Sequence, residues 1–280
     1  MRHTHPSLLR DSTPAIPGLR FGTPRPEARI RFAVLQALAQ GRMGFHFQPV
    51  VRAEAPEFTA FHEMLVRMTL PSGETVNAGT FMPAVERGPL GREIDRLALA
   101  QAVELLAQDP TLRLSINISP LTMGDDGWLA IFRRATAGSR NALRRLILEV
   151  TETEAIRDVG QTRDFMDHVR AAGVAFALDD FGAGATGFRH FRDLRFDIVK
   201  IDGGFVEGVA GTRDAQVLVE CLMAVARHFD MMTVAERVER PEDAAWLAGL
   251  GINCLQGYLY GRPVADIRHP ALATRRAAAC

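Results

Sequence analysis

Polar side chains that can do chemistry follow the apolar runs of this chain in a regular order. Eight apolar runs end in a polar or charged residue, and most of these residues are acidic. They are Gln48, Glu63, Asn117, Glu149, Asp179 with Asp180, Lys200, Glu236 and Gln256. In barrels of alternating strands and helices, the carboxyl ends of the strands share one open face that carries the chemistry. These side chains are therefore predicted to converge on a single site.

The residue types in this set indicate a metal site. Five of them are carboxylates, which repel one another and raise one another's pKa when they are gathered without cations. Mg²⁺ and Mn²⁺ prefer carboxylate and amide oxygens to thiolate or imidazole, and the set supplies such oxygens. The histidines have no ligand-like spacing, and Cys221, Cys254 and Cys280 match no zinc motif. A site for hard divalent cations is predicted.

The elements that must position these residues alternate along the chain. Strands are expected over residues 44–51, 60–66, 112–118, 146–150, 174–178, 196–201, 232–235 and 252–255. Helices are expected from residue 80, over 90–107, 128–137 and 161–172, near 188, and over 214–228 and 241–250. The first two strands are joined by a short polar turn, as in a hairpin. The later alternation implies parallel crossover units, and their number favours a closed α/β barrel over an open sheet.

Composition sets the domain limits and excludes some partners. Residues 1–28 hold five prolines and are predicted to be a flexible tail, followed by one barrel domain over 29–270 and a tail over 271–280. Thirty-three basic residues balance 33 acidic ones, which argues against a surface that binds nucleic-acid polymers or a polybasic membrane anchor. No apolar stretch approaches the roughly 18 residues that span a bilayer. A cytoplasmic protein without membrane insertion is expected.

Blander alternatives exist for parts of this pattern. The G-x-G-x-x-G string from Gly182 to Gly187 follows a strand and formally matches a dinucleotide-binding fingerprint. However, Asp179 and Asp180 would face the pyrophosphate without compensation there. A lone acidic residue at a strand end is more often a turn residue, and Lys200 with Asp202 could be a surface ion pair. Occurring in order on successive strands, the set favours the metal site.

Taken together, the motifs resemble the EAL-domain family, the phosphodiesterases that open the bacterial second messenger cyclic di-GMP. The motifs are FHEMLVRM, SINIS, LEVTETEA, ALDDFGAG, IVKID, VAERVE and QGYLYGRP, from about Gln48 to Pro263. Each is weak alone, and the specificity of the resemblance comes from their order and number. The resemblance implies a TIM-type (β/α)₈ barrel of the EAL variant, with an antiparallel first strand.

The resemblance also implies a role for each residue. Two divalent cations, Mg²⁺ or Mn²⁺, are expected, the first held by Glu63, Asn117, Glu149 and Asp179. Asp179 bridges to the second cation, which Asp180 and Glu236 also hold. The residues expected to assist catalysis are Lys200, which orients the attacking water, Glu152, which braces the loop after Asp180, and Glu239. Gln48, Arg67 and Gln256 are expected on the substrate side, with Gln256 and Glu239 also supporting the metal ligands.

The implied activity is hydrolysis of cyclic di-GMP to linear pGpG by a homodimer. The alternative is a catalytically weak EAL-type receptor or protein-interaction module. Three departures from the family bear on this choice: Met64 replaces alanine in the Glu-Ala-Leu signature, Arg237 stands where glycine is usual, and the loop after Asp180 carries Ala183, Ala185 and Thr186. The loop usually has threonine, an aromatic and small hydroxyl residues at these positions. An active but slow enzyme is expected.

Overall fold

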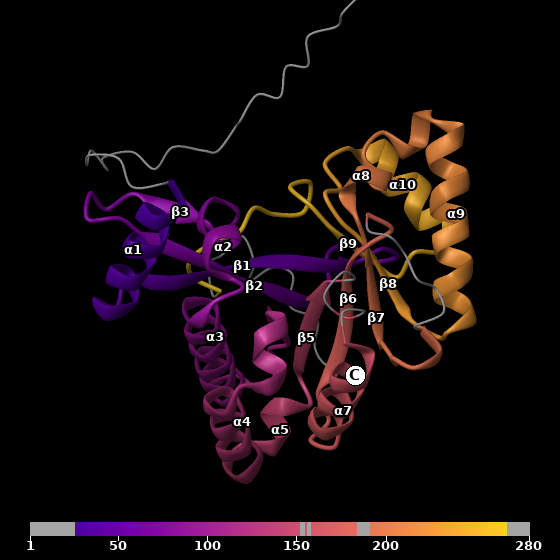
Figure 1. Ribbon diagram of the computed structural model, residues 1–280. Coiled ribbons are helices and arrows are strands. Elements are labelled where there is room, and N and C mark those ends of the chain that lie inside the picture. The colour runs from indigo at the N-terminus through magenta and orange to yellow at the C-terminus, as the bar shows by residue number, and fades with distance from the viewer. Residues whose placement is uncertain (1–25, 152–154, 156–157, 184–190, 268–280) are drawn as a thin grey trace, which may run out of the picture.

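The strands form one sheet that closes on itself (Figure 1). The structure, a computed structural model, describes residues 26–151, 155, 158–183 and 191–267. Within these residues the strands are β1 (Met43–Arg52), β2 (Thr59–Thr69), β3 (Thr75–Asn77), β4 (Leu114–Asn117), β5 (Leu146–Thr151), β6 (Ala175–Phe181), β7 (Ile198–Ile201), β8 (Met232–Ala235) and β9 (Cys254–Gln256). Their order is β1-β9-β8-β7-β6-β5-β4-β2-β3, and β1 also pairs with β2. The ring therefore contains every described strand except β3.

Strand direction distinguishes β1 from the rest of the ring. It is antiparallel to both of its neighbours, β2 and β9. From β2 through β4 to β9, each neighbouring pair is parallel. This confirms the expected (β/α)₈ barrel with an antiparallel first strand. The open, doubly wound sheet of a dinucleotide-binding domain is thereby excluded.

The helices cover the outside of the ring (Figure 1). They are α1 (Pro26–Ala39), α2 (Ala78–Val85), α3 (Pro89–Gln108), α4 (Asp126–Gly138), α5 (Arg140–Leu143), α7 (Val159–Arg170), α8 (Gly203–Val206), α9 (Arg213–His228) and α10 (Pro241–Leu250), with 3₁₀ turns η1 (Pro120–Gly124) and η3 (Val209–Gly211). Outward side chains of the strands, such as Leu148 and Phe176, share one apolar core with α3 to α10, whereas α1 and α2 belong to a second core beside the ring. None of the described helices has the length and apolar character needed to cross a bilayer.

Helix α1 is an element that the sequence pattern did not predict. It begins at Pro26, inside the segment 1–28 that was expected to be a tail. Its buried residues Ile30, Val34 and Ala37 follow helical spacing, and proline suits the first turn of a helix. Residues 1–25 and 271–280 and the helix expected near residue 188 lie outside the described residues.

Beside the ring, α1, α2, β3 and the adjoining ends of β1 and β2 form a small projection, which we call the hairpin lobe (Figure 1). β3, which was not predicted, pairs with the end of β2. The core of the lobe consists of Ile30, Val34, Ala37, Met68, Leu70, Val76, Phe81, Val85 and Ile94. Because β1 and β2 run on into this lobe, it forms a wall at one side of the barrel mouth.

The inside of the barrel contains an apolar layer, which we call the floor layer. Seven buried residues form one cluster there: Val50, Phe61, Ile147, Ala177, Ile198, Val234 and Cys254. Each comes from a different strand of the ring, and β4 contributes the buried Ser115. Close-packed apolar side chains exclude water. The floor layer therefore closes the barrel below the mouth.

Candidate active site

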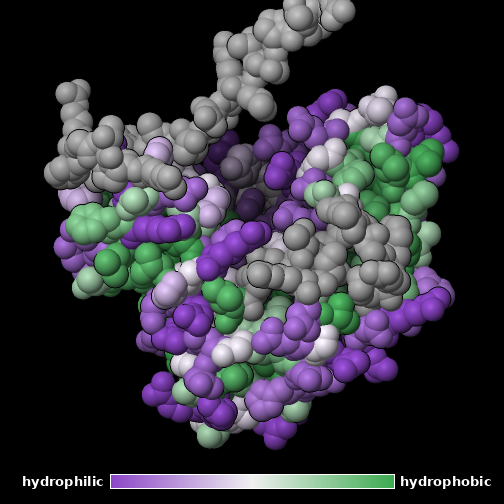
Figure 2. Space-filling view, viewed as in Figure 1, coloured by the Kyte–Doolittle hydropathy of each residue, from purple (hydrophilic) through white to green (hydrophobic). Residues whose placement is uncertain are grey.

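One layer of polar side chains lies above the floor layer, and we call it the polar layer. Alternate side chains of a barrel strand point inward, so a residue two positions toward the mouth stands above each floor residue. These positions hold Gln48, Glu63, Asn117, Glu149, Asp179, Lys200, Glu236 and Gln256. The structure thus brings together one predicted site residue from every strand of the ring. Figure 2 shows the hydrophilic hollow above them.

Gln48 and Glu63 reach this layer from the interior of their strands. Both lie inside the strands expected over residues 44–51 and 60–66, and in the observed strands β1 and β2 they are register partners. The reason is the hairpin lobe, into which β1 and β2 continue past the barrel mouth. The other members of the polar layer lie within two residues of the end of their strand, as predicted.

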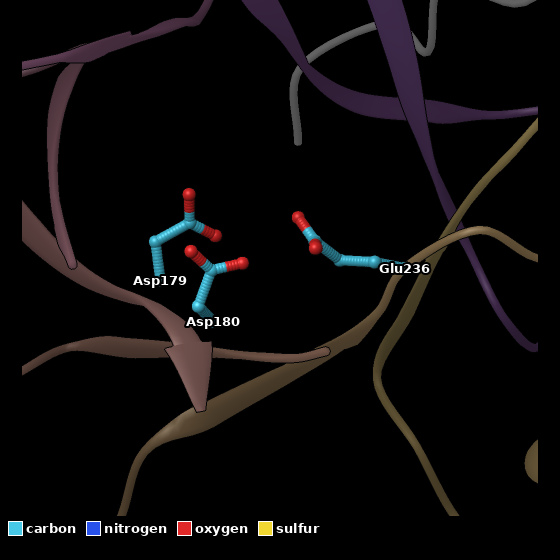
Figure 3. Close-up of side chains that lie close together, drawn as sticks. All are labelled: Asp179, Asp180 and Glu236. Atoms are coloured by element: carbon cyan, nitrogen blue, oxygen red, sulfur yellow. The ribbon is translucent and has the colours of Figure 1, made fainter. Parts of the chain in front are cut away.

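Asp179 and Asp180 are adjacent, so an ordinary strand would point them to opposite faces. Two irregularities prevent this. The register between β6 and β7 shifts between Leu178 and Phe181, and Asp180 has a φ of 55° in the left-handed region. As a result, Asp179, Asp180 and Glu236 each bring an oxygen to within 4.8 Å of the others (Figure 3). Backbone strain of this kind occurs where a site needs it.

Lys200 lies at the centre of the polar layer, with 1% of its side chain exposed. Its Nζ lies 2.7 Å from Glu236 Oε1, 2.8 Å from Glu149 Oε2, 3.1 Å from Asp179 Oδ1 and 3.4 Å from Glu63 Oε2. Burial alone would lower the pKa of Lys200, but the four carboxylates, Asp179 foremost, raise it well above its ordinary value. Lys200 is therefore a fixed cation, and a surface ion pair is excluded.

The carboxylates outnumber this single cation, which raises their proton affinity. Burial first, and then the charge of Glu63, raise the pKa of Glu149 to about 8 against the opposing effect of Lys200. Burial likewise raises the pKa of Glu236 well above its ordinary value, and it raises that of the partly exposed Asp180. Glu149 Oε1 is buried and has no hydrogen-bond donor among the described residues. Divalent cations fit such a set, because they supply the missing positive charge and are bound by oxygens.

Amide side chains fix the orientation of Glu63. Asn117 Nδ2 donates to Glu63 Oε1 at 3.0 Å, and Gln256 Nε2 donates to Glu63 Oε2 at 2.5 Å. Gln256 Nε2 also lies 3.3 Å from Gln48 Oε1, and Gln48 Nε2 donates to the carbonyl of Gly261 at 3.2 Å. The amides of Gln48 and Gln256 are thus turned toward each other and toward Glu63. This geometry suits the predicted support of a metal ligand.

A cleft of about 440 Å³ joins the polar layer to the hairpin lobe. Its lining includes Asn117 and Asp179 on the polar side and Leu65, Met82 and Ile94 on the apolar side. Arg67, predicted on the substrate side, is buried on β2. Burial lowers the pKa of Arg67, while Glu63 and Tyr258 oppose that effect. The cleft can hold a molecule that has both an apolar face and charged groups.

The predicted residues that remain are Glu239, Glu152, Met64 and the loop after Asp180. Glu239 is exposed in the segment after β8, and among the described residues no hydrogen bond or ion pair joins it to the layer. Glu152, Ala185 and Thr186 lie outside the described residues. Ala183 donates its backbone N–H to the carbonyl of Asp180 at 3.1 Å. Met64 is buried in the apolar core shared by the strands and the surrounding helices.

Asp95 is a supporting residue that sequence reasoning missed. It is buried on α3 and accepts hydrogen bonds from Ser119 N at 2.8 Å and Thr122 Oγ1 at 2.5 Å. These bonds hold η1 directly after Asn117. Burial raises the pKa of Asp95 to about 6. The signal was present in the sequence, because a charged residue beside Ile94 on an apolar helix face needs a partner.

Comparison with known proteins identifies relatives of this arrangement. The EAL domain model matches residues 31–263. Cyclic di-GMP phosphodiesterase PdeB of Shewanella oneidensis is 32% identical over 242 residues, which are 85% of this chain and 28% of PdeB. Cyclic di-GMP phosphodiesterase PdeF of Escherichia coli is 28% identical over 245 residues, which are 85% of this chain and 32% of PdeF. The chain thus spans about a third of the length of these curated relatives.

Solved structures agree with the sequence matches. The PaMucR phosphodiesterase in complex with c-di-GMP superposes with a TM-score of 0.77 at 29% identity, over 86% of this chain and 99% of that chain. The EAL enzyme Bd1971, 22% identical, has the same fold, with a TM-score of 0.81 over 89% of this chain and 69% of that chain. Since the family model extends over the barrel and the whole polar layer, this chain belongs to the EAL domain family.

Proposed function

We propose that this chain is a metal-dependent phosphodiesterase that hydrolyses cyclic di-GMP to linear pGpG and so controls the level of this second messenger. One observation carries the proposal: Asp179, Asp180 and Glu236 bring oxygens within 4.8 Å of one another beside the buried cation Lys200. The names of PdeB and PdeF and the c-di-GMP bound in the PaMucR structure support the choice of substrate.

Two divalent cations, Mg²⁺ or Mn²⁺, complete the proposed site. Glu63, Asn117, Glu149 and Asp179 would hold one, and Asp179, Asp180 and Glu236 would hold the other. When bound, such a pair lowers the pKa of water and stabilises charge that develops on a phosphoryl group. Asn117 suits its role because its Nδ2 donates a hydrogen bond to Glu63 Oε1, which leaves its carbonyl oxygen for a cation.

Lys200 has two tasks in this proposal. Its ammonium balances the carboxylates of the polar layer while the cations are absent. In the loaded enzyme it donates hydrogen bonds that orient the attacking water and offset negative charge on the phosphate. A general-base role does not suit it, because its raised pKa keeps it protonated.

The cleft is the proposed place of the dinucleotide. A purine base would lie against the apolar wall formed by Leu65, Met82 and Ile94. Arg67 would bind the phosphate side through its planar guanidinium. Gln48 and Gln256 would also face the substrate, and Gln256 holds Glu63 in place by its hydrogen bond. Glu239 and Glu152 are proposed to support the ligands and the loop after Asp180.

Product analysis tests this function. The species assayed is expected to be a homodimer. Purified protein is incubated with cyclic di-GMP and Mg²⁺ or Mn²⁺, and the nucleotides are separated by chromatography. Linear pGpG should accumulate, disappear with excess chelator and return when the cation is restored. Ca²⁺ accepts looser geometry and should support binding with little turnover. Turnover that persists in excess chelator would contradict the proposed chemistry.

A nucleotide receptor is the alternative, because the loop after Asp180 differs from the family pattern. Such a protein would bind cyclic di-GMP in the same cleft and leave it intact. Calorimetric binding together with unchanged nucleotide after long incubation would favour it. The full set of oxygen ligands in the polar layer favours the enzyme.

A further inference from the structure

Arg237 places a second strained residue at the barrel mouth. It follows Glu236 and has a φ of 51°, in the left-handed region that favours glycine. Asp180 follows Asp179 with the same kind of backbone at the end of β6. In β6 this backbone interrupts the inward and outward alternation of the strand, whereas Arg237 lies just past the end of β8 and so stands at the mouth. A strained non-glycine residue beside a site suggests that its side chain is used there.

The neighbours of Arg237 keep its guanidinium at the mouth. The side chain lies across Gly203, where an added Cβ would stand 2.3 Å from Arg237 Cδ. Arg237 Nη2 lies 3.9 Å from Asp202 Oδ2, beyond hydrogen-bond distance, and Arg237 directly follows Glu236, whose carboxylate has an oxygen within 4.8 Å of one of Asp180. Arg237 is therefore close to the outer aspartate of the candidate metal site.

The guanidinium has hydrogen-bonding capacity that the protein does not use. In the described part of the chain it donates no hydrogen bond, its ion-pair partner being Asp202 at 3.9 Å, and 69% of its side chain is exposed. A guanidinium carries five N–H donors in a rigid fork that matches the oxygens of a phosphate. The buried cation Lys200, in contrast, is fully engaged by four carboxylates.

We propose that Arg237 is a substrate-binding residue that donates hydrogen bonds to a phosphate oxygen of the bound dinucleotide at the β7–β8 side of the mouth. The inference rests on the proposed function. Arg237 would thus act opposite Arg67, which approaches the site from β2. Its contribution is to affinity, since it is placed outside the polar layer where the cations would bind.

Calorimetry in the presence of Ca²⁺ tests the proposal, because it measures the affinity for cyclic di-GMP under conditions that should allow little turnover. Arg237→Gly should weaken binding about fivefold, Arg237→Lys less, and KM in Mg²⁺ should rise with kcat nearly unchanged. Glycine adopts the left-handed φ freely, so the melting temperature should not fall. Arg240→Ala is the matched control, because it removes an exposed arginine three residues away. It should bind within about twofold of wild type.

Gly203 supplies an independent test. Gly203→Ala must displace the Arg237 side chain, so it should weaken binding in the wild-type background and have little effect in Arg237→Gly. Equal affinity of wild type and Arg237→Gly, or additive effects of the two substitutions, would overturn the inference. So would tighter cation binding by Arg237→Gly without a change in nucleotide affinity. A wild-type protein that binds no cyclic di-GMP would instead overturn the proposed function.

Discussion

The floor layer and the polar layer lie on the same strands, two residues apart, and have opposite chemistry. The floor layer contains Ile147, Ile198 and Val234, while the polar layer places Glu149, Lys200 and Glu236 directly above them. The apolar layer contributes packing and excludes water. Because it closes the barrel from below, charges above it interact in a medium of low dielectric constant. Residues that stabilise the barrel and residues that carry its chemistry therefore lie on the same face of each strand, two positions apart.

Removing the cation of the polar layer should give the largest effect. Lys200→Met retains most of the side-chain volume but loses the charge, and turnover should fall about 100-fold or more, the scale of one lost transition-state contact. The metal-free protein should melt at a lower temperature, because four carboxylates lose their shared partner. Initial rates and melting curves with and without Mg²⁺ measure both effects.

Added Mg²⁺ should still raise the melting temperature of Lys200→Met, since its carboxylates remain. Wild-type turnover in this variant would remove Lys200 from the proposed mechanism and would break the contrast between the layers.

A substitution in the floor layer should have the reverse pattern. Ile198→Ala, two residues before Lys200, should lower the free energy of unfolding by about 2–4 kcal/mol through the cavity it leaves. Turnover per folded molecule should change less than about threefold, because the polar layer is retained. Urea unfolding measures the free energy of unfolding, and initial rates measure turnover. Ile198→Val is the milder control. If Ile198→Ala lost as much turnover as Lys200→Met, the separation of stability in the floor layer from chemistry in the polar layer would be contradicted.

Asp95 contrasts with the carboxylates around Lys200, because it is buried and is stabilised by hydrogen bonds without a neighbouring cation. Its folded pKa of about 6 lies above the ordinary value of 3.8, so folding favours its protonated form. Its contribution to stability is therefore present at low pH and is lost as the pH rises through about 4 to 6. Between pH 4.5 and 7 this loss should amount to about 2 kcal/mol.

Asp95→Asn cannot titrate and should lack this component. The difference in unfolding free energy between wild type and Asp95→Asn, measured by urea at several pH values, isolates it from other groups. A difference that stays constant with pH would show that the folded pKa of Asp95 is not raised.

Much of the ring and the membership of the polar layer could be predicted, because both follow from local patterns. Apolar runs mark strands, and a polar residue near the end of each run marks the mouth. The partners of Lys200 could not be predicted, because they depend on closure of the ring, which brings Glu63 within reach across 137 positions of sequence. The left-handed backbone of Asp180 was not predicted either, because aspartate adopts it more readily than most residues but still does so at few positions, and the surrounding structure decides where.

Helix α1 and strand β3 were missed for a related reason. Both are stabilised by the core of the hairpin lobe, which residues from several distant elements form jointly. Pro26 also made the start of α1 resemble the proline-rich segment before it. Asp95 could have been found, because its position on an apolar helix face was visible in the sequence.

Because the floor layer closes the barrel from below, molecules reach the polar layer through the barrel mouth. Cations bound in the polar layer would lie deeper than the dinucleotide, so they would have to enter first and leave last. A bound nucleotide would then block the barrel mouth, and exchange of the cations with solution should slow while the nucleotide is present. Loading with cations would thus become a condition for each round of catalysis, and the supply of Mg²⁺ or Mn²⁺ would set how many molecules can respond to cyclic di-GMP.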